Sequence, residues 1–312
     1  MKFPALMLSF VLLGSIAFAE DANFTRNEDV IYGRKFGLAM TLDVIKPKEN
    51  ANGLGIIYCV SGGWYSGHDN IPSVIGASAP YLKRGYTIFA VVHGSNPKFT
   101  IPEVVKDMQR AVRFIRFHAK DYGVDPDHLG ITGGSAGGHL SLMMGTTGDN
   151  GDPNAKDPVD KVSSKVQCVA CFFPPTDFLN YSKPGESAVG VGILSGFAAP
   201  FDFHDYDPKL KKFVPVTDAE KIRQIAVSIS PAQRADVNSA PALIAHGDAD
   251  KLVPIQQAEL MIEKLKAANV DCKLITHAGG GHGWKDMQIE AEQFADWFDA
   301  HLKAAAAPAK DK

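Results

Sequence analysis

Short apolar runs alternate with longer amphipathic segments along most of this chain. Near-continuous apolar runs occupy residues 53–60, 86–94, 128–132, 165–173, 240–247 and 272–278. Runs of this length are typical of strands buried on both faces, as in a parallel sheet covered by helices. Residues 102–122 carry apolar side chains at three- and four-residue spacing, which predicts a helix that ends at Gly123.

Further amphipathic segments follow the later runs and predict helices to about Met144, over 254–268 and from 284 onward. Residues 30–37 and 39–47 read as two early antiparallel strands. The alternation predicts an α/β fold with a mostly parallel central sheet flanked by helices. Residues 174–237 are irregular and rich in Gly, Pro, Phe and Asp. We expect this segment to be an insertion or cap that sets specificity, because long loops in compact domains are usually functional.

The two ends of the chain do not fit the fold pattern. Met1 and Lys2 precede an apolar stretch to Phe18, and Ala17-Phe18-Ala19 forms a small-residue cleavage site. This pattern predicts a secretory signal peptide over 1–19, and hence export to the periplasm or the medium. The folded domain is expected over 20–304 and a disordered tail over 305–312. No later apolar run reaches the ~18 residues that a membrane span needs.

Composition excludes some classes of function. The chain has 312 residues, of which 45% are hydrophobic, and a net charge of −3. These values favour one sizeable globular domain and argue against a nucleic-acid partner, which would select a basic surface. Cys168 and Cys171 resemble a redox or metal pair, but an offset of three residues on a strand points them to opposite faces. We expect them, like Cys59, to be buried free thiols.

A glycine-rich turn, "ITGGSAGGHL" at 131–140, joins a predicted strand to a predicted helix. A phosphate-binding loop would need a following lysine or a G-x-G-x-x-G pattern, and neither is present. The turn instead contains G-x-S-x-G, which presents a nucleophilic serine between strand and helix. Ser135 is therefore the predicted nucleophile, and the N–H of Ala136 is a predicted oxyanion donor.

A serine nucleophile needs a base, and the base needs an orienting acid. In this arrangement the acid and then the histidine follow later strands. "ALIAHGDADKLVP" offers Asp248 and Asp250, and "LITHAGGGHGW" offers His277 and His282. We favour Asp250, since Asp248 is suited to a cap or turn. We favour His282, which lies in a flexible glycine loop, whereas His277 falls inside the strand pattern.

The loop after an early strand should complete the oxyanion hole. In "YCVSGGWYSG", Gly62 and Gly63 let backbone N–H groups approach a substrate, and Trp64 can wall the pocket. The alternative is an ordinary glycine turn, and the position of the loop relative to Ser135 favours the functional interpretation.

These motifs together resemble the α/β-hydrolase esterase/lipase group, which includes hormone-sensitive-lipase-like enzymes and bacterial feruloyl and acetyl-xylan esterases. The resemblance rests on "DPDHLG", "GITGGSAGGHL", "HGDADKLVP" and "GGGHGW" and covers about residues 27–303. It implies the α/β-hydrolase fold and a triad of Ser135, Asp250 and His282. One departure is that the usual H-G-G-G-W reads Val60-Ser61-Gly62-Gly63-Trp64 here. The hydroxyl of Ser61 could compensate for the missing histidine.

The resemblance implies a serine carboxylic-ester hydrolase that forms an acyl-enzyme without a metal or organic cofactor. A small-molecule or carbohydrate ester, with a short acyl group, is the expected substrate. Two alternatives stay open from the sequence. One is a serine peptidase related to the prolyl oligopeptidases, although about 30 residues before the first strand cannot form their propeller. The other is a non-catalytic binding protein on a hydrolase scaffold.

Overall fold

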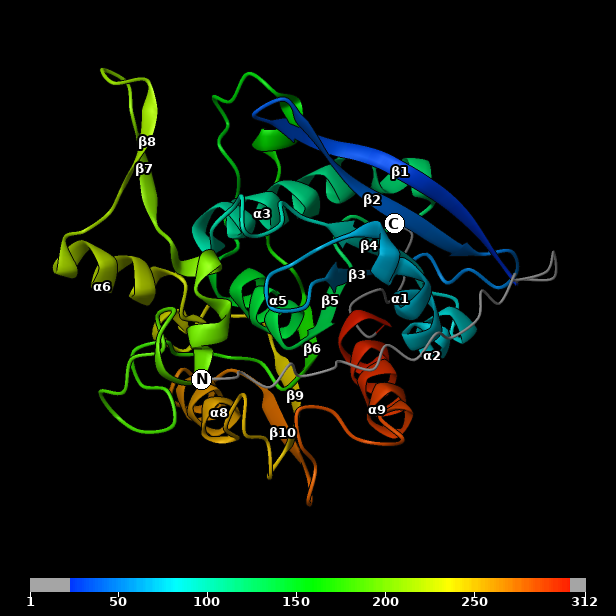
Figure 1. Cartoon of the computed structure of the whole chain (residues 1–312). Coiled ribbons are helices and arrows are strands. Elements are labelled where there is room, and N and C mark those ends of the chain that lie inside the picture. Colours follow the sequence, from blue (N-terminus) through cyan, green and yellow to red (C-terminus); the bar gives the residue numbers. More distant parts are fainter. Residues whose placement is uncertain (1–22, 304–312) are drawn as a thin grey trace, which may run out of the picture.

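A computed structural model describes residues 23–303 of the chain. An eight-stranded sheet runs through it, in the order β1-β2-β4-β3-β5-β6-β9-β10 (Figure 1). The strands are β1 (Phe24–Lys35), β2 (Leu38–Pro47), β3 (Gly55–Val60), β4 (Thr87–Val92), β5 (Leu129–Gly134), β6 (Cys168–Phe172), β9 (Ala242–Gly247) and β10 (Cys272–His277). The predicted signal peptide and the predicted C-terminal tail lie outside the described residues.

The sheet is mostly parallel, as the sequence pattern predicts. Strands β4, β3, β5, β6, β9 and β10 run parallel, and β1 and β2 form an antiparallel pair that joins the sheet at β4. Each parallel strand coincides with one of the apolar runs of the sequence, and β5 extends two residues beyond its run, to Gly134. The carboxyl ends of the parallel strands therefore meet at one edge, where an open α/β sheet places its binding site.

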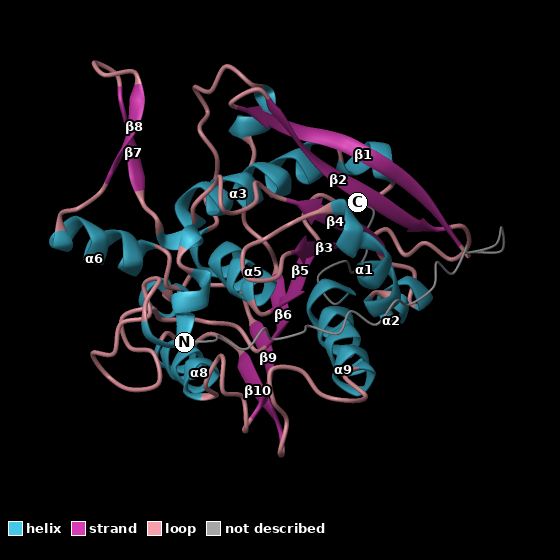
Figure 2. Ribbon diagram, in the orientation of Figure 1, coloured by secondary structure: helices cyan, strands magenta, loops and turns pink. Residues whose placement is uncertain are grey.

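Helices cover both faces of the sheet (Figure 2). The helices α3 (Ile101–Phe117), α5 (Ala136–Thr147) and α8 (Gln256–Ala267) pack into one apolar cluster, and α1 (Ile71–Ala77), α2 (Ala79–Lys83) and α9 (Gln288–Phe298) into a second. The predicted helix 102–122 is divided, because α3 ends at Phe117 and α4 (Ala119–Tyr122) follows. Gly123 closes α4 in the left-handed conformation, with φ of 69°, which glycine adopts at low cost.

The cysteines divide between these two cores. Cys168 belongs to the cluster under α9, and Cys171 to the cluster under α5. The two thiols thus lie on opposite faces of β6, and all four cysteines of the chain are free. Burial raises the pKa of Cys59 to about 12, so this thiol stays protonated and packs as a small apolar side chain.

Residues 174–237 contain more regular structure than the sequence pattern indicates. They form η3 (Gly192–Phe197), η4 (Ala199–Phe201), a hairpin of β7 (His204–Asp207) and β8 (Lys212–Pro215), α6 (Ala219–Ser228) and α7 (Pro231–Arg234). Figure 1 shows the hairpin reaching out beyond the rest of the molecule. The helix α6 begins where Asp218 accepts a hydrogen bond from the Lys221 N–H. The expectation of an irregular segment is therefore wrong for α6.

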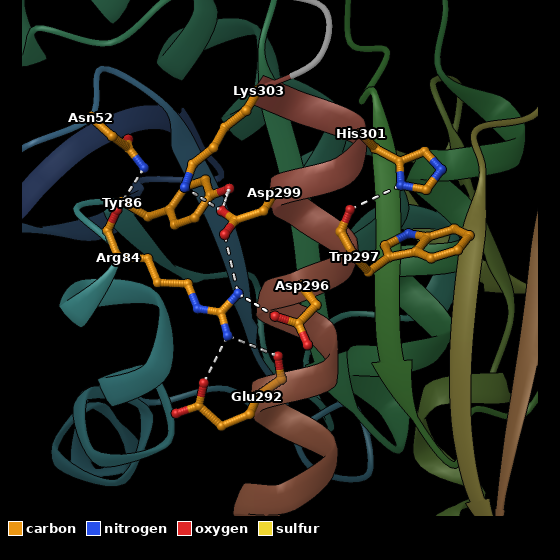
Figure 3. A network of polar contacts seen from close by, with 9 residues as sticks. All are labelled: Asn52, Arg84, Tyr86, Glu292, Asp296, Trp297, Asp299, His301 and Lys303. Atoms are coloured by element: carbon orange, nitrogen blue, oxygen red, sulfur yellow. Dashed lines mark hydrogen bonds and ion pairs between the residues drawn. The ribbon is translucent and has the colours of Figure 1, made fainter.

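The last helix is joined to the segment between α2 and β4 by a network of charges (Figure 3). The guanidinium of Arg84 contacts the carboxylates of Glu292, Asp296 and Asp299 at 2.9, 2.6 and 3.1 Å. The Tyr86 hydroxyl donates to Asp299 over 2.7 Å, and Asp299 begins the π-helical turn η5 (Asp299–Lys303).

Two short 3-10 turns, η1 (His68–Asn70) and η2 (Pro158–Lys161), complete the elements. Within residues 23–303, no helix is both long and apolar enough to cross a membrane.

Candidate active site

Ser135 lies at the junction of β5 and α5, at the carboxyl edge of the sheet. Its φ of 54° and ψ of −120° are a strained conformation for a residue with a side chain. The Ser135 N–H donates to the Phe172 carbonyl over 3.0 Å, which ties the turn to the end of β6. A Cβ on Gly137 would lie 2.8 Å from the Cys59 carbonyl oxygen. Glycine there lets α5 start directly beneath β3.

Three side chains from three loops form one hydrogen-bonded chain. Ser135 Oγ lies 2.8 Å from Nε2 of His282. Nδ1 of the same ring lies 2.7 Å from Oδ2 of Asp250. Asp250 follows β9 and His282 follows β10, so adjacent parallel strands deliver the acid and the base beside the serine. This is the order and geometry that activates a serine hydroxyl.

The carboxylate of Asp250 is buried and held ionised. Burial by itself raises its pKa, but hydrogen bonds from His246 and His282 and from the Val253 N–H outweigh burial, and the pKa is well below its usual value. Oδ1 accepts from the N–H groups of Leu252 and Val253 at 2.9 Å each. Oδ2 lies 2.7 Å from His282 Nδ1 and 3.5 Å from His246 Nε2, so its shorter contact orients the imidazole of His282.

The two alternative residues serve the fold. Asp248 is exposed, and its Oδ1 accepts from the Gly279 N–H over 2.6 Å, which joins the acid loop to the histidine loop. His277 pairs through Nδ1 with Glu290 at 3.0 Å and stacks on Trp284 at 4.7 Å between ring centroids. Neither side chain contacts Ser135, so the structure places Asp250 and His282, and not these two, beside the serine.

The predicted oxyanion loop follows β3 and faces the same serine. The Gly62 N–H donates to the Tyr65 carbonyl over 2.9 Å, so it is already engaged within the loop, and a role for Gly62 as an oxyanion donor stays a prediction. Among residues 23–303, no backbone acceptor pairs with the N–H of Gly63, Trp64 or Ala136. Ala136 is the first residue of α5, where helix N–H groups point out of the helix end. Gly63, Trp64 and Ala136 therefore have the N–H groups that an oxyanion can use.

The loop lacks the histidine of the H-G-G-G-W pattern, and the hydroxyl of Ser66 holds it instead, which the sequence did not reveal. The Ser66 hydroxyl donates to the Val60 carbonyl over 2.5 Å and accepts from the His93 N–H at 3.2 Å. Ser66 thus closes the loop onto the ends of β3 and β4. The Ser61 hydroxyl is buried, and no partner for it occurs in the described part of the chain. A compensating hydrogen bond from Ser61 is absent there.

A cavity of about 540 Å³ opens over the serine and histidine. Its walls come mainly from residues 58–63 and from α1, with Phe173, Leu252 and Phe197 completing it. Phe197 is the contribution of residues 174–237 to this lining. Its ring occupies the space beside Gly63, where a Cβ would lie 2.6 Å from it. A second cavity of about 680 Å³ lies between α1–α2 and the start of α9. The two cavities share Tyr58, Ala77, Gly134 and Phe173.

One group of side chains away from this cavity has the composition of a metal site. Ligand atoms of Asp29, Asp43 and His68 lie within 4.8 Å of one another. Asp43 is already paired with the Arg26 guanidinium at 2.6 Å, which neutralises the charge that a cation would need. The group is better described as an ion-pair cluster of β1, β2 and η1, and the absence of a cofactor stays a prediction.

Comparison with known proteins places this arrangement in a family. A family model described as BD-FAE matches residues 42–265, and the dienelactone hydrolase family matches residues 226–310. The probable carboxylic ester hydrolase LipM of Mycobacterium tuberculosis is 27% identical over 78% of this chain and 52% of its own length. An acetylxylan esterase of Xylanibacter ruminicola is 29% identical over 84% of this chain and 48% of its own length. The chain spans about half the length of these curated relatives.

Solved structures agree with the fold. A truncated carbohydrate esterase from gut microbiota superposes with a TM-score of 0.74 at 26% identity, over 91% of this chain and 99% of that one. The BD-FAE match extends from within β2 to within α8 and includes Ser135 and Asp250. The chain therefore belongs to the BD-FAE family and has the α/β-hydrolase fold.

Proposed function

We propose that this protein is a serine carboxylic-ester hydrolase that acts through an acyl-enzyme on Ser135. The observation that carries the proposal is the unbroken chain from Ser135 Oγ through His282 to Asp250, at 2.8 and 2.7 Å. The esterase names of the relatives support the same reaction class. A non-catalytic binding protein would have no need to keep three side chains from separate loops in this alignment.

In the proposed mechanism, His282 Nε2 takes the Ser135 hydroxyl proton while Oγ attacks the ester carbonyl carbon. The carbonyl π electrons move to the oxygen, and the resulting oxyanion is stabilised by the N–H groups of Ala136 and the Gly63–Trp64 segment. The imidazolium, paired with Asp250, then gives its proton to the departing alcohol. Water repeats the sequence on the acyl-enzyme, releases the acid and restores the free hydroxyl.

The expected substrates are short-acyl esters, including acyl groups on carbohydrates. The cavity above Ser135 holds about 540 Å³, within the range of small-molecule sites. Phe197 and Gly63 meet beside the serine and limit the space there. The acetylxylan esterase and the carbohydrate esterase among the similar proteins support a carbohydrate as the alcohol half.

Initial rates on p-nitrophenyl acetate, butyrate and octanoate test the proposal. Short-chain esters should be hydrolysed fastest, and Ser135→Ala should lower turnover by about 10⁶-fold. Ser228→Ala, on the exposed face of α6, is the matched control and should retain the wild-type rate. Release of acetate from acetylated xylo-oligosaccharides tests the carbohydrate half. Wild-type activity on peptide p-nitroanilides, with none on esters, would reject the proposal in favour of a peptidase.

Export to the periplasm or the medium is part of the proposal, and it rests on the sequence of residues 1–19. Mass spectrometry of the protein from fractionated cells tests it. Export with cleavage predicts a mature N-terminus at Glu20 in the periplasmic or external fraction. An intact Met1 in the cytoplasmic fraction would contradict it.

A further inference from the structure

His139 is a buried histidine that the mechanism above does not use. It lies on α5, one helical turn after Ser135, and its side chain is fully buried. Both ring nitrogens have partners. Nδ1 lies 3.2 Å from the indole Nε1 of Trp64, and Nε2 lies 2.7 Å from the carbonyl oxygen of Ile229.

These partners determine the protonation of the ring. An indole N–H can only donate and a carbonyl oxygen can only accept. Nδ1 of His139 must therefore be the bare nitrogen, and Nε2 must carry the hydrogen. Burial lowers the pKa of His139 to about 4, although the bond to Ile229 opposes that shift. The neutral ring is thus the stable form near neutral pH.

The ring joins three parts of the protein that are distant in sequence. Trp64 belongs to the oxyanion loop, His139 to the helix that begins at the nucleophile, and Ile229 to the end of α6. The Trp64 ring also packs on Phe178 and Phe201, at 5.8 and 5.4 Å between centroids. Side chains from residues 174–237 therefore enclose this contact.

The backbone of Trp64 is in a conformation that needs support. Its φ is 60°, and Gly63 before it has φ of 55°. A large residue in this region is strained, and the conformation persists only where its surroundings hold it. Trp64 is 2% exposed, and the His139 bond gives its buried indole N–H an acceptor. The buried Trp64 side chain thus holds the Gly63–Trp64 backbone in this conformation.

We propose that His139 is a positioning residue, which holds the Trp64 indole and thereby aims the oxyanion loop at the carbonyl attacked by Ser135. This inference rests on the proposed esterase function. His139 has no access to the substrate, and His282 occupies the base position on Ser135 Oγ. In this proposal, its effect on the reaction passes through the Trp64 bond, and the Ile229 bond fixes the ring that accepts it.

The test compares the steady-state kinetics of His139→Leu and His139→Asn on one ester, p-nitrophenyl acetate. Leucine fills the space but offers no acceptor, so kcat on p-nitrophenyl acetate should fall by about a hundredfold, the lower end of the loss for a removed oxyanion donor. KM should stay within about threefold, because the loop acts on the transition state. Asparagine can place Oδ1 near the position of Nδ1 and should recover part of kcat. His118→Leu, a partly exposed histidine at the end of α3, is the control and should not change kcat.

A second replacement isolates the single hydrogen bond. At position 64, 3-benzothienyl-alanine keeps the bicyclic ring of tryptophan but has sulfur where the N–H is. It should lower kcat as His139→Leu does, and the two changes together should cost no more than either one. The replacement at position 64 still tests the proposal if His139→Leu does not fold. A folded His139→Leu with unchanged kcat, equal losses in the leucine and asparagine variants, or fully additive effects would each overturn the proposal.

Nitrogen-15 spectra of the histidine side chains separate this inference from the proposed function. They should show His139 as the neutral tautomer with hydrogen on Nε2, and the Trp64 indole N–H as hydrogen-bonded. Absence of esterase activity in the wild type would reject the proposed function, while this signature would still report on the His139–Trp64 contact. A protonated Nδ1 in the folded protein at pH 7 would overturn the inference directly.

Discussion

The side-chain amide of Asn96 donates to the carbonyl oxygen of Gly63 over 2.8 Å. The Asn96 N–H also donates to the Trp64 carbonyl, at 3.3 Å. A trans peptide points its C=O and N–H in opposite directions. Because the Gly63 carbonyl is directed at Asn96, the Trp64 N–H must point away from Asn96. One asparagine on the loop after β4 thus sets the direction of a proposed oxyanion donor.

Removing the amide should therefore affect catalysis more than binding. Asn96→Ala frees the Gly63 carbonyl and allows the peptide to rotate, so kcat on p-nitrophenyl acetate should fall about tenfold or more. Asn96→Asp should give a similar or larger loss, since a carboxylate cannot donate to the carbonyl. Steady-state kinetics measure both. An Asn96→Ala enzyme with wild-type kcat would show that the loop holds its shape without this bond.

The two aspartates after β9 should differ sharply. Asp250→Asn keeps the size of the side chain and its bonds to Leu252 and Val253, but it stops holding the required tautomer of His282. We expect kcat to fall about 10⁴-fold. Asp248→Asn, whose side-chain oxygen can still accept from Gly279, should stay near wild type. Comparable losses in both variants, measured on the same ester, would contradict the assignment of the acid.

The sequence could predict the three side chains that the structure brings together, because each is marked by its local surroundings. Ser135 sits in a short glycine motif, and Asp250 and His282 each follow an apolar strand. Asn96 and His139 carry no such mark, because their partners Gly63 and Trp64 are 33 and 75 positions away. The helix α6 does carry an apolar stripe, because Ile222, Ile225, Ala226 and Ile229 repeat at three- and four-residue spacing and pack on the core. The Gly, Pro and Asp around it in 174–237 led to the prediction of an irregular segment.

Phe197 should limit the acyl group that fits beside Gly63. Phe197→Ala removes the ring that lies against the oxyanion loop and opens the cavity over Ser135. The ratio of kcat/KM for p-nitrophenyl octanoate to that for acetate should rise about tenfold, the scale of a modest change in apolar contact. Phe213→Ala, on the exposed hairpin, is the control. A ratio that does not move in Phe197→Ala would place acyl selection elsewhere, such as the second cavity beside α9.

Arg84 should contribute to stability and not to the reaction. It pairs with three carboxylates on α9 and η5, and its side chain is 23% exposed. Arg84→Met should lower the free energy of unfolding by about 1–2 kcal/mol, because one partly buried cation serves several anions. Arg223→Met breaks a single exposed pair with Glu220 and should cost clearly less than Arg84→Met, because water screens an exposed pair. Urea unfolding measures both, and equal effects would argue against a special role for the Arg84 network.

Two buried histidines should make the fold sensitive to mild acid. Burial lowers the pKa of both His93 and His139 to about 4, whereas an unfolded histidine titrates near pH 6.5. Between these values the unfolded chain binds more protons than the folded one, so the free energy of unfolding falls as the pH is lowered. Inside this window each ring lowers the free energy of unfolding by about 1.4 kcal/mol for every pH unit of acidification. Above the window it adds no pH dependence.

His93→Leu tests this at the ring whose Nε2 is buried, with no partner among the described residues. Urea unfolding of the wild type and the variant at pH 7.0, 6.0 and 5.0 gives the comparison. The wild type should lose about 1.4 kcal/mol per pH unit more than the variant between pH 6 and 5. Above pH 7 the free energies of unfolding of the two proteins should change equally with pH, because the histidine is neutral in both the folded and the unfolded state. Parallel curves for the two proteins would mean that His93 accepts a proton while the protein stays folded.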